Sequence, residues 1–531
     1  MDKSKKNAIV FSIIAIVTLI TLVVGATYAY FQAQGETGTS ANLRVTTYTT
    51  DVFNFEVGND ISIYADATSF ASGKGNASGS TFAKAILTAN NKTNTSTMNY
   101  YLYLNISNNT FTYTQNENTP ELLLTIKDAG GNSVTDITSL AYKTVTDGKG
   151  ASISGYDITN KSGLITLFNN KEITASPTKT DEWNITVTLV NYDKDQSNNA
   201  GKSFNAKLMI QKEKIETVAT VCSNGQTLSS CIIAMNGKDD TLYHHTSSLA
   251  NGAGDNSYRY AGASDQVNNF VCFGSNTTPC PTDNLYRIIG VFDNKAGENQ
   301  TEQRVKLIKS DYATSTLLGG DGDYSKMYSA TNWNKSSYKG NNLANIATYN
   351  WNKTGQNTWS LSNLNKTNLN QNFITNIGKE WAAKIDETTW KVGGNTWSNL
   401  NQPAKTAYQN EIVQPQPETY SSETEDNKKI GLMYASDYGF AAASSAWTTK
   451  LFSYNGEAII NVNWMYMGLV EWTISRNATR SNYVLYVSNS GNVYYRNVDS
   501  SALAVRPVFY LTSSVNYASG SGSAIDPIVV N

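Results

Sequence analysis

Apolar and polar residues alternate with a period of two in many short runs of the first part of the chain. The runs include Tyr101–Ile106, Trp183–Val190 and Phe204–Ile210. Because successive side chains of a strand point to opposite faces, this period predicts strands that are buried on one side. Segments rich in Asn, Asp, Gly and Ser, at Asp128–Ser133 and Asp193–Lys202, separate the runs. They favour antiparallel hairpins in a β-sandwich over parallel units.

The hydrophobic pattern changes in the second part of the chain. Two apolar runs, Leu285–Phe292 and Val305–Lys309, flank a polar loop and predict paired strands. Large apolar residues then recur every four residues from Phe373 to Ile385, which places them on one face of a helix packed against a sheet. Asn395–Lys429 is rich in Asn, Pro and Glu and is predicted to be a mobile loop. Strands are predicted again at Ile430–Met433, Tyr483–Val487, Val493–Tyr495 and Val505–Leu511. The predicted fold is mostly β with a C-terminal α+β domain.

The N-terminus predicts export across a bacterial cytoplasmic membrane. The lysine-rich start Met1–Lys6 precedes the uncharged, mainly apolar run Ala8–Val24, and Thr27 and Ala29 fit the small-residue pattern of a cleavage site after Ala29. An uncut signal anchor is the alternative, because the run exceeds the ~7–15 residues of a signal-peptide core and falls slightly short of the ~20 that span a bilayer. Either way, Tyr30–Asn531 would lie outside the membrane, in the extracellular space or on the cell surface.

At 531 residues the chain is too long for one hydrophobic core, so several domains are expected. Strand alternation stops between Gln211 and Asp240. The predicted boundaries are 1–29 for the signal peptide or anchor, 30–212 for the β-sandwich, 213–241 for a linker, and 242–531 for the second domain.

The composition and net charge of the chain limit the classes of binding partner that can be expected. Charged residues make up only 16% of the chain, against roughly 25% in ordinary soluble proteins, whereas Tyr is abundant, at 32 residues. The net charge is −2 and basic residues are scattered, so neither a nucleic-acid footprint nor an acidic tail is present. A nucleic-acid partner is therefore not expected, and the membrane is a partner only through the N-terminal segment.

The four cysteines form two closely spaced pairs, Cys222 with Cys231 and Cys272 with Cys280. An even number outside the cell indicates disulfides, and two local loops are the simplest of three possible pairings. A zinc site built from four thiolates is the rival, but its usual spacing leaves ~2–4 residues between paired ligands, fewer than intervene here.

The first domain resembles the TasA/camelysin family of exported β-sandwich proteins, whose signals are cut by a SipW-type peptidase. The resemblance rests on Gly25–Phe31, Thr81–Asn90, Asn191–Gln196 and Gly201–Phe204. It implies a jelly-roll-like sandwich and self-assembly into fibres, in which the segment Tyr30–Val45 would complete the sheet of the next subunit by strand addition.

The second domain resembles a C-terminal module of Gram-positive surface proteins that is similar in layout to the C-type-lectin-like and formylglycine-generating-enzyme-like fold. The matching segments are Tyr258–Tyr260, Asn268–Gly274, Asn284–Phe292, Gly431–Gly439 and Val505–Leu511. The resemblance implies the fold and a binding role, and it specifies no activity.

No enzymatic chemistry, metal or cofactor is predicted. The two histidines, His244 and His245, are adjacent and therefore point apart, and a His-Glu-x-x-His motif is absent, which argues against the zinc endopeptidase activity attributed to camelysin. We expect both to be solvated at a domain edge. No cysteine follows Cys280, so formylglycine chemistry is not carried over, and the calcium triplets of lectins are missing. Asp321 and Asp323 are expected to belong to a turn.

The remaining candidate is a polar-aromatic binding surface between Trp472 and Ser500, since Tyr, Arg and Asn suit recognition. The predicted ligand-binding residues are Trp472, Arg476, Arg480, Asn482, Tyr494, Arg496 and Asn497. Trp464 and Tyr483 are expected in the core, and Arg506 is expected to be buried and hydrogen-bonded. The predicted function is a surface or matrix protein that binds a surface glycan or protein ligand. The alternatives are a purely structural matrix or fibre subunit and, third, a secreted hydrolase.

Overall fold

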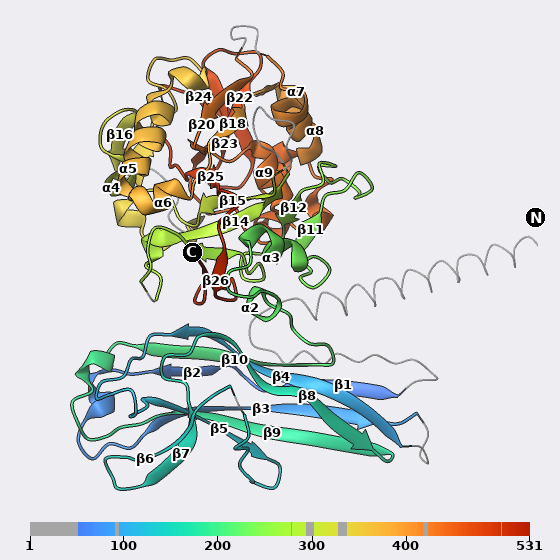
Figure 1. The fold of residues 1–531 in the computed structure, drawn as a ribbon, viewed down its shortest axis with the longest axis vertical. Coiled ribbons are helices and arrows are strands. Elements are labelled where there is room, and N and C mark those ends of the chain that lie inside the picture. Colours follow the sequence, from blue (N-terminus) through green and yellow to red (C-terminus); the bar gives the residue numbers. More distant parts are fainter. Residues whose placement is uncertain are drawn as a thin grey trace, which may run out of the picture. The chain divides into compact units, whose positions relative to one another are not determined.

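A computed structural model of the chain describes residues 51–90, 95–137, 139–277, 279–293, 302–327, 337–417, 423–500 and 502–531. They form two units that divide between Ile215 and Glu216. Both consist mainly of antiparallel sheets, so the predicted mostly β class is confirmed (Figure 1). The predicted cleavage site at Ala29 lies outside these residues. Within the described ranges, no helix is both long enough and apolar enough to cross a membrane.

The first unit contains a six-stranded and a four-stranded sheet, with strand orders β1-β3-β9-β5-β7-β6 and β2-β10-β4-β8. The strands are β1 (Val52–Val57), β2 (Ile61–Tyr64), β3 (Ala77–Thr88), β4 (Ser96–Asn109), β5 (Leu122–Asp128), β6 (Tyr142–Thr146), β7 (Ser152–Asp157), β8 (Gly163–Ala175), β9 (Thr178–Leu189) and β10 (Ser203–Gln211). The three alternating runs named above form parts of β4, β9 and β10, with Val190 directly after the end of β9.

One hydrophobic core contains residues from both sheets of this unit. Ala83 and Ala85 of β3 and Ile185 of β9 are fully buried together with Leu104 of β4 and Phe204 of β10. Every second residue of β3 is buried from Thr81 onward, as the period-two pattern requires. The jelly-roll topology implied by the family resemblance stays a prediction.

The second unit is built on a nine-stranded sheet whose main path runs β21-β25-β15-β14-β13-β27-β26, with β12 also pairing with β14 and β11 with β12. Its strands are β11 (Leu242–His244), β12 (Tyr258–Tyr260), β13 (Phe270–Cys272), β14 (Leu285–Phe292), β15 (Arg304–Lys309), β21 (Ile430–Gly431), β25 (Val508–Tyr510), β26 (Tyr517–Ser519) and β27 (Ile528–Val530). The predicted pairing of β14 with β15 is confirmed and is antiparallel.

A four-stranded sheet, β19-β22-β23-β24, and two strand pairs complete the strands of this unit. They are β19 (Gly394–Asn395), β22 (Glu471–Asn477), β23 (Tyr483–Val487), β24 (Val493–Asn497), the pair β16 (Tyr324–Met327) and β17 (Ala347–Tyr349), and the pair β18 (Thr388–Lys391) and β20 (Glu425–Lys428).

Short helices surround these sheets, with α4–α6 on one side of the unit and α7 and α8 on another (Figure 1). They are α2 (Val218–Val221), α3 (Leu228–Ala234), α4 (Ser315–Leu318), α5 (Ile374–Asn376), α6 (Lys379–Ala383), α7 (Trp397–Leu400), α8 (Ala404–Tyr408), α9 (Ala435–Phe440) and α10 (Glu457–Ile460), with π-helical stretches at Leu364–Phe373 and Gln409–Val413.

The helix predicted from Phe373 to Ile385 is interrupted. Its large apolar residues are buried as expected, including Trp381 and Ile385. However, Gly378 has φ of 90°, a left-handed conformation that favours glycine, and it separates α5 from α6. The apolar face was therefore predicted correctly, and the continuous helix was wrong.

Two segments predicted to lack a core belong to the core of the second unit. In the predicted linker, Leu228 and Ile232 of α3 are buried in that core. In the predicted mobile loop, Leu400, Ala404 and Ala407 are buried in it as well. The apolar residues of these short helices are few and are surrounded by polar sequence, so a helical period cannot be recognised from the sequence.

Only one of the two predicted disulfides is formed. Cys272 is bonded to Cys280, which excludes a zinc site made of all four thiolates. Cys222 and Cys231 remain thiols. A side-chain hydrogen bond joins these two sulfurs, lowering the pKa of Cys222 and raising that of Cys231. The second bridge is therefore corrected to a hydrogen-bonded thiol pair.

Candidate functional site

An aromatic patch lies on β23 and β24, next to the short helix α7. Its members are Trp397, Phe452, Tyr483, Tyr486, Tyr494 and Tyr495. Trp397 is 39% exposed and the other five rings are half-buried. The patch is therefore open to solvent while its rings remain packed against one another.

The rings contact one another in mixed orientations. Tyr494 and Tyr495 stack with centroids 4.7 Å apart, and Trp397 stands edge-on to both at 5.2 and 5.7 Å. Phe452 packs against Trp397 at 4.8 Å and against Tyr494 at 5.5 Å. Edge-to-face and offset contacts of this kind are the favourable ones, so the patch is a preorganised surface.

Two arginines border the patch. The exposed guanidinium of Arg480 lies 5.1 Å from the ring centroid of Tyr483 and 5.5 Å from that of Tyr495. Arg496 lies 5.7 Å from Tyr486. These distances are within the range of cation–π contact, which positions the two guanidinium groups beside the rings, and a guanidinium carries only hydrogen-bond donors.

Two of the predicted ligand-binding residues are core residues. Trp472 is 1% exposed, and its Nε1 donates a hydrogen bond to the Tyr349 carbonyl at 2.8 Å. Arg476 is fully buried, and its Nε donates to the Val392 carbonyl at 2.7 Å. All seven residues of β22 are buried, so these two side chains are corrected from ligand contacts to structural ones.

The other predicted residues lie at or beside the patch. Tyr494 is part of it, and Arg480 and Arg496 border it. Asn482 is half-buried in the connection between β22 and β23. Asn497 accepts a hydrogen bond from the Asp499 amide, at 3.1 Å, through its side-chain oxygen.

The sequence prediction missed Trp397 and Phe452. Trp397 lies in a segment predicted to be a loop, far from Tyr494 along the chain. The tertiary fold brings α7 to the sheet, and no local pattern indicates that proximity. The only signal available was an unexplained tryptophan in a polar stretch.

The patch offers stacking surfaces and neutral hydrogen-bonding groups. Burial, together with the neighbouring Tyr495, raises the pKa of Tyr494, so its phenol stays protonated at neutral pH and can donate. Among the described residues, no three His, Cys, Asp or Glu side chains form a group suited to a metal ion. Asp323 lies in a turn, as expected, and is buried; its carboxylate accepts from the backbone amides of Lys353 and Leu364, which joins that turn to two distant segments.

The two histidines have different environments. His244 stacks on Tyr258 with ring centroids 4.1 Å apart. His245 is fully buried beside Phe440 and Trp447, so the expectation of a solvated pair was wrong for it. Burial, reinforced by the charge of Arg259, lowers the pKa of His245 to about 3.

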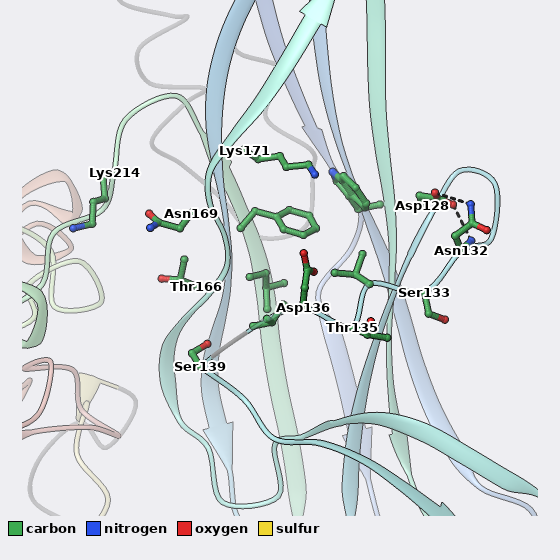
Figure 2. A pocket seen from close by; sticks show the side chains of 15 residues that line it. Asp128, Asn132, Ser133, Thr135, Asp136, Ser139, Thr166, Asn169, Lys171 and Lys214 are labelled. Carbon is green, nitrogen blue, oxygen red and sulfur yellow. Dashed lines mark hydrogen bonds between the residues drawn. The ribbon is translucent and has the colours of Figure 1, made fainter.

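A separate cavity of about 810 Å³ lies in the first unit (Figure 2). One wall is Thr166–Asn169 of β8, which ends the four-stranded sheet, and another is the segment from Asn132 to Ile137. Phe168 and Trp183 pack at 4.5 Å inside it, and Lys171 Nζ lies 5.6 Å from the Trp183 ring. The cavity therefore combines an aromatic surface with the strand that ends this sheet in the described part of the chain.

A scan against protein-family models gave no match to this chain, and a search of curated proteins found none similar to it.

Proposed function

We propose that this protein is an exported surface or matrix protein whose second unit binds a glycan through the aromatic patch. The observation that carries the proposal is the exposed Trp397 ring standing edge-on to the stacked Tyr494 and Tyr495 rings, with Arg480 beside them. Aromatic and arginine side chains of this kind usually provide most of the energy of a binding surface.

The chemistry of the patch suits a sugar. A pyranose ring has apolar C–H faces that pack on aromatic rings. Its hydroxyls accept hydrogen bonds from a guanidinium, and they can either donate to a phenol or accept from it. Because the patch involves no metal ligands, binding should persist in the presence of a chelator. A protein ligand, which would also use Tyr, Trp and Arg contacts, is the alternative outcome of the test.

The test is a glycan array probed with the purified protein, with an array of surface proteins run in parallel. The proposal expects a defined subset of glycans to bind, equally with and without EDTA. If only proteins bind, the ligand of the patch is a protein and the glycan proposal is wrong. If nothing binds on either array, the result favours a structural subunit without a specific ligand.

One observation favours a structural role for the first unit. Among the described strands, β8 ends the four-stranded sheet and lines the cavity, and an unpaired strand edge accepts an extended peptide by backbone hydrogen bonding. We propose that Tyr30–Val45 of another copy adds there as a strand. A synthetic peptide of that sequence should suppress fibre growth measured by light scattering, whereas a scrambled peptide should not. Equal growth with both peptides would refute this assembly mode.

A further inference from the structure

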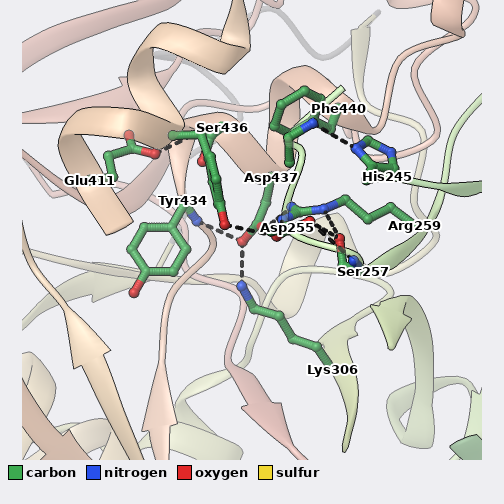
Figure 3. Close-up of polar contacts among 12 residues, drawn as sticks. His245, Asp255, Ser257, Arg259, Lys306, Glu411, Tyr434, Ser436, Asp437 and Phe440 are labelled. Atoms are coloured by element: carbon green, nitrogen blue, oxygen red, sulfur yellow. Dashed lines mark hydrogen bonds and ion pairs between the residues drawn. The ribbon is translucent and has the colours of Figure 1, made fainter. Parts of the chain in front are cut away.

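Four charged side chains form a buried network in the second unit (Figure 3). Lys306 Nζ lies 2.6 Å from Asp437 Oδ2, and the two side chains are each 1% exposed. Asp437 Oδ1 lies 3.4 Å from Arg259 Nη1, and Arg259 Nη2 lies 2.6 Å from Asp255 Oδ2. Asp255 is 18% exposed and the other three side chains are buried, so two positive and two negative groups lie together with no net charge.

Lys306 is poorly solvated for an ammonium ion. Its Nζ lies 4.7–5.6 Å from the ring centroids of Phe292, Trp390, Tyr434 and Tyr510. Asp437 is the one hydrogen-bond acceptor found for it in the described part of the chain, although an ammonium group has three donors. Its Nζ is therefore held against a single carboxyl group, and once a proton has passed to that carboxyl the amine has it as a neighbouring electrophile.

We propose that Lys306 and Asp437 condense to form an amide, a covalent cross-link between β15 and α9. The Nζ proton passes to Oδ2, the Nζ lone pair attacks Cγ, the Cγ–Oδ2 bond breaks, and one water molecule leaves with Oδ2 and two protons from nitrogen. The products are a secondary amide and water, so the step needs no oxidant, reductant or other reactant.

The surroundings of Asp437 suit that reaction. The Tyr434 amide donates to Oδ2 at 3.0 Å, and Arg259 faces Oδ1, the oxygen that carries negative charge in the tetrahedral intermediate. Donors placed at a developing oxyanion lower the barrier to acyl transfer. The fold also holds amine and carboxyl in contact, which replaces a bimolecular encounter by an effective concentration on the order of 10⁵ M or more.

The charges remain balanced after the reaction. A buried ion pair carries the desolvation cost of both ions, and the amide removes both charges from the core. Arg259 then remains paired with Asp255, to which it is already bonded at 2.6 Å. Burial raises the pKa of the nearby Glu411. The remaining network is again neutral.

Two other buried cations in the same unit provide internal comparisons. Lys309, on the same strand, is 1% exposed, and no hydrogen-bond partner is found for its Nζ in the described ranges. In this part of the chain it therefore has no carboxyl at hydrogen-bond distance to acylate it. Arg506 is bonded to Glu471 at 2.6 Å, but a guanidinium is permanently charged and is not a nucleophile. The proposal is thus specific to Lys306.

The test is mass spectrometry of the purified, reduced and denatured full chain. The intact mass should be lower than the sequence mass by one water molecule, and trypsin should release Val305–Lys309 joined to Ile430–Lys450 as one branched peptide, uncut after Lys306. Lys306→Met should restore the full mass, whereas the matched variant Lys309→Met should keep the loss of water.

A full mass after prolonged incubation of the folded wild-type protein would overturn the proposal, leaving an ordinary ion pair. A loss of water found only in linear peptides would overturn it as well, since it would indicate a cyclic imide at Asp437. That product is opened by hydroxylamine, and its formation would not require Lys306.

Discussion

Buried His245 should make the second unit sensitive to mild acid. The unfolded chain takes up a proton at the ordinary histidine pKa of about 6.5, whereas His245 in the folded protein does so only at about 3. Between these values the unfolded state binds more protons, so stability falls as the pH falls. At about 1.4 kcal/mol per pH unit, the loss is about 2 kcal/mol at pH 5 and approaches about 5 kcal/mol at pH 3.

The perturbation that tests this is His245→Asn. The Asn side-chain oxygen can replace Nδ1, which accepts from the Ala253 amide at 3.0 Å, and the group does not titrate. Urea unfolding followed by tryptophan fluorescence reports mainly on the second unit, because all ten tryptophans except Trp183 lie beyond Ile215. Between pH 7 and pH 5 the variant should lose about 2 kcal/mol less than wild type.

The neighbouring change His244→Asn is the matched control, since that ring is half-exposed and stacks on Tyr258. Between pH 7 and pH 5, the His244→Asn variant should lose as much stability as wild type does, so that only the His245→Asn variant differs. If wild type and His245→Asn lose stability in parallel from pH 7 to pH 5, then burial of His245 does not control the acid response and the reasoning fails.

Two further predictions concern the core and the cysteines. Arg506→Met should cost about 3–5 kcal/mol, measured by urea unfolding, because it leaves Glu471 charged or protonated in a dry site; a cost below about 1 kcal/mol would show that the pair is not effectively buried. Non-reducing peptide mapping should recover Cys272 joined to Cys280, while the other two cysteines react with iodoacetamide after denaturation. Recovery of all four as disulfides would show that the hydrogen-bonded thiol pair oxidises in the isolated protein.

The sequence was informative where one local pattern controls burial. The apolar run Leu285–Phe292 is the strand β14 with the predicted bounds, and the predicted strand at Tyr483–Val487 is β23. The prediction of a buried, hydrogen-bonded Arg506 is confirmed, as is a core position for Trp464. In each case the residue or its neighbours carried the signal.

The sequence was misleading where burial depends on distant partners. Arg476 falls on the same face of β22 as Trp472 and Ile474, but its charge and the polar residues around it made it look like a surface residue. It is buried because β22 lies between β19 and β23 and because Val392 and Glu423 supply acceptors. Tyr483, expected in the core, is half-buried at the patch. Trp397 joins the patch through a tertiary contact that no periodicity encodes.

The most direct test of the proposed function compares binding by wild type and single variants to the strongest glycan found on the array, measured by titration calorimetry. Trp397→Ala, Arg480→Ala and Tyr494→Ala should each weaken binding by roughly 1–3 kcal/mol, with melting temperatures close to that of wild type. Tyr64→Ala, at a ring that is 65% exposed in the first unit, should bind as wild type does. Unchanged affinity in all three patch variants, or affinity lost only together with the melting transition, would contradict the assignment of the patch as the binding surface.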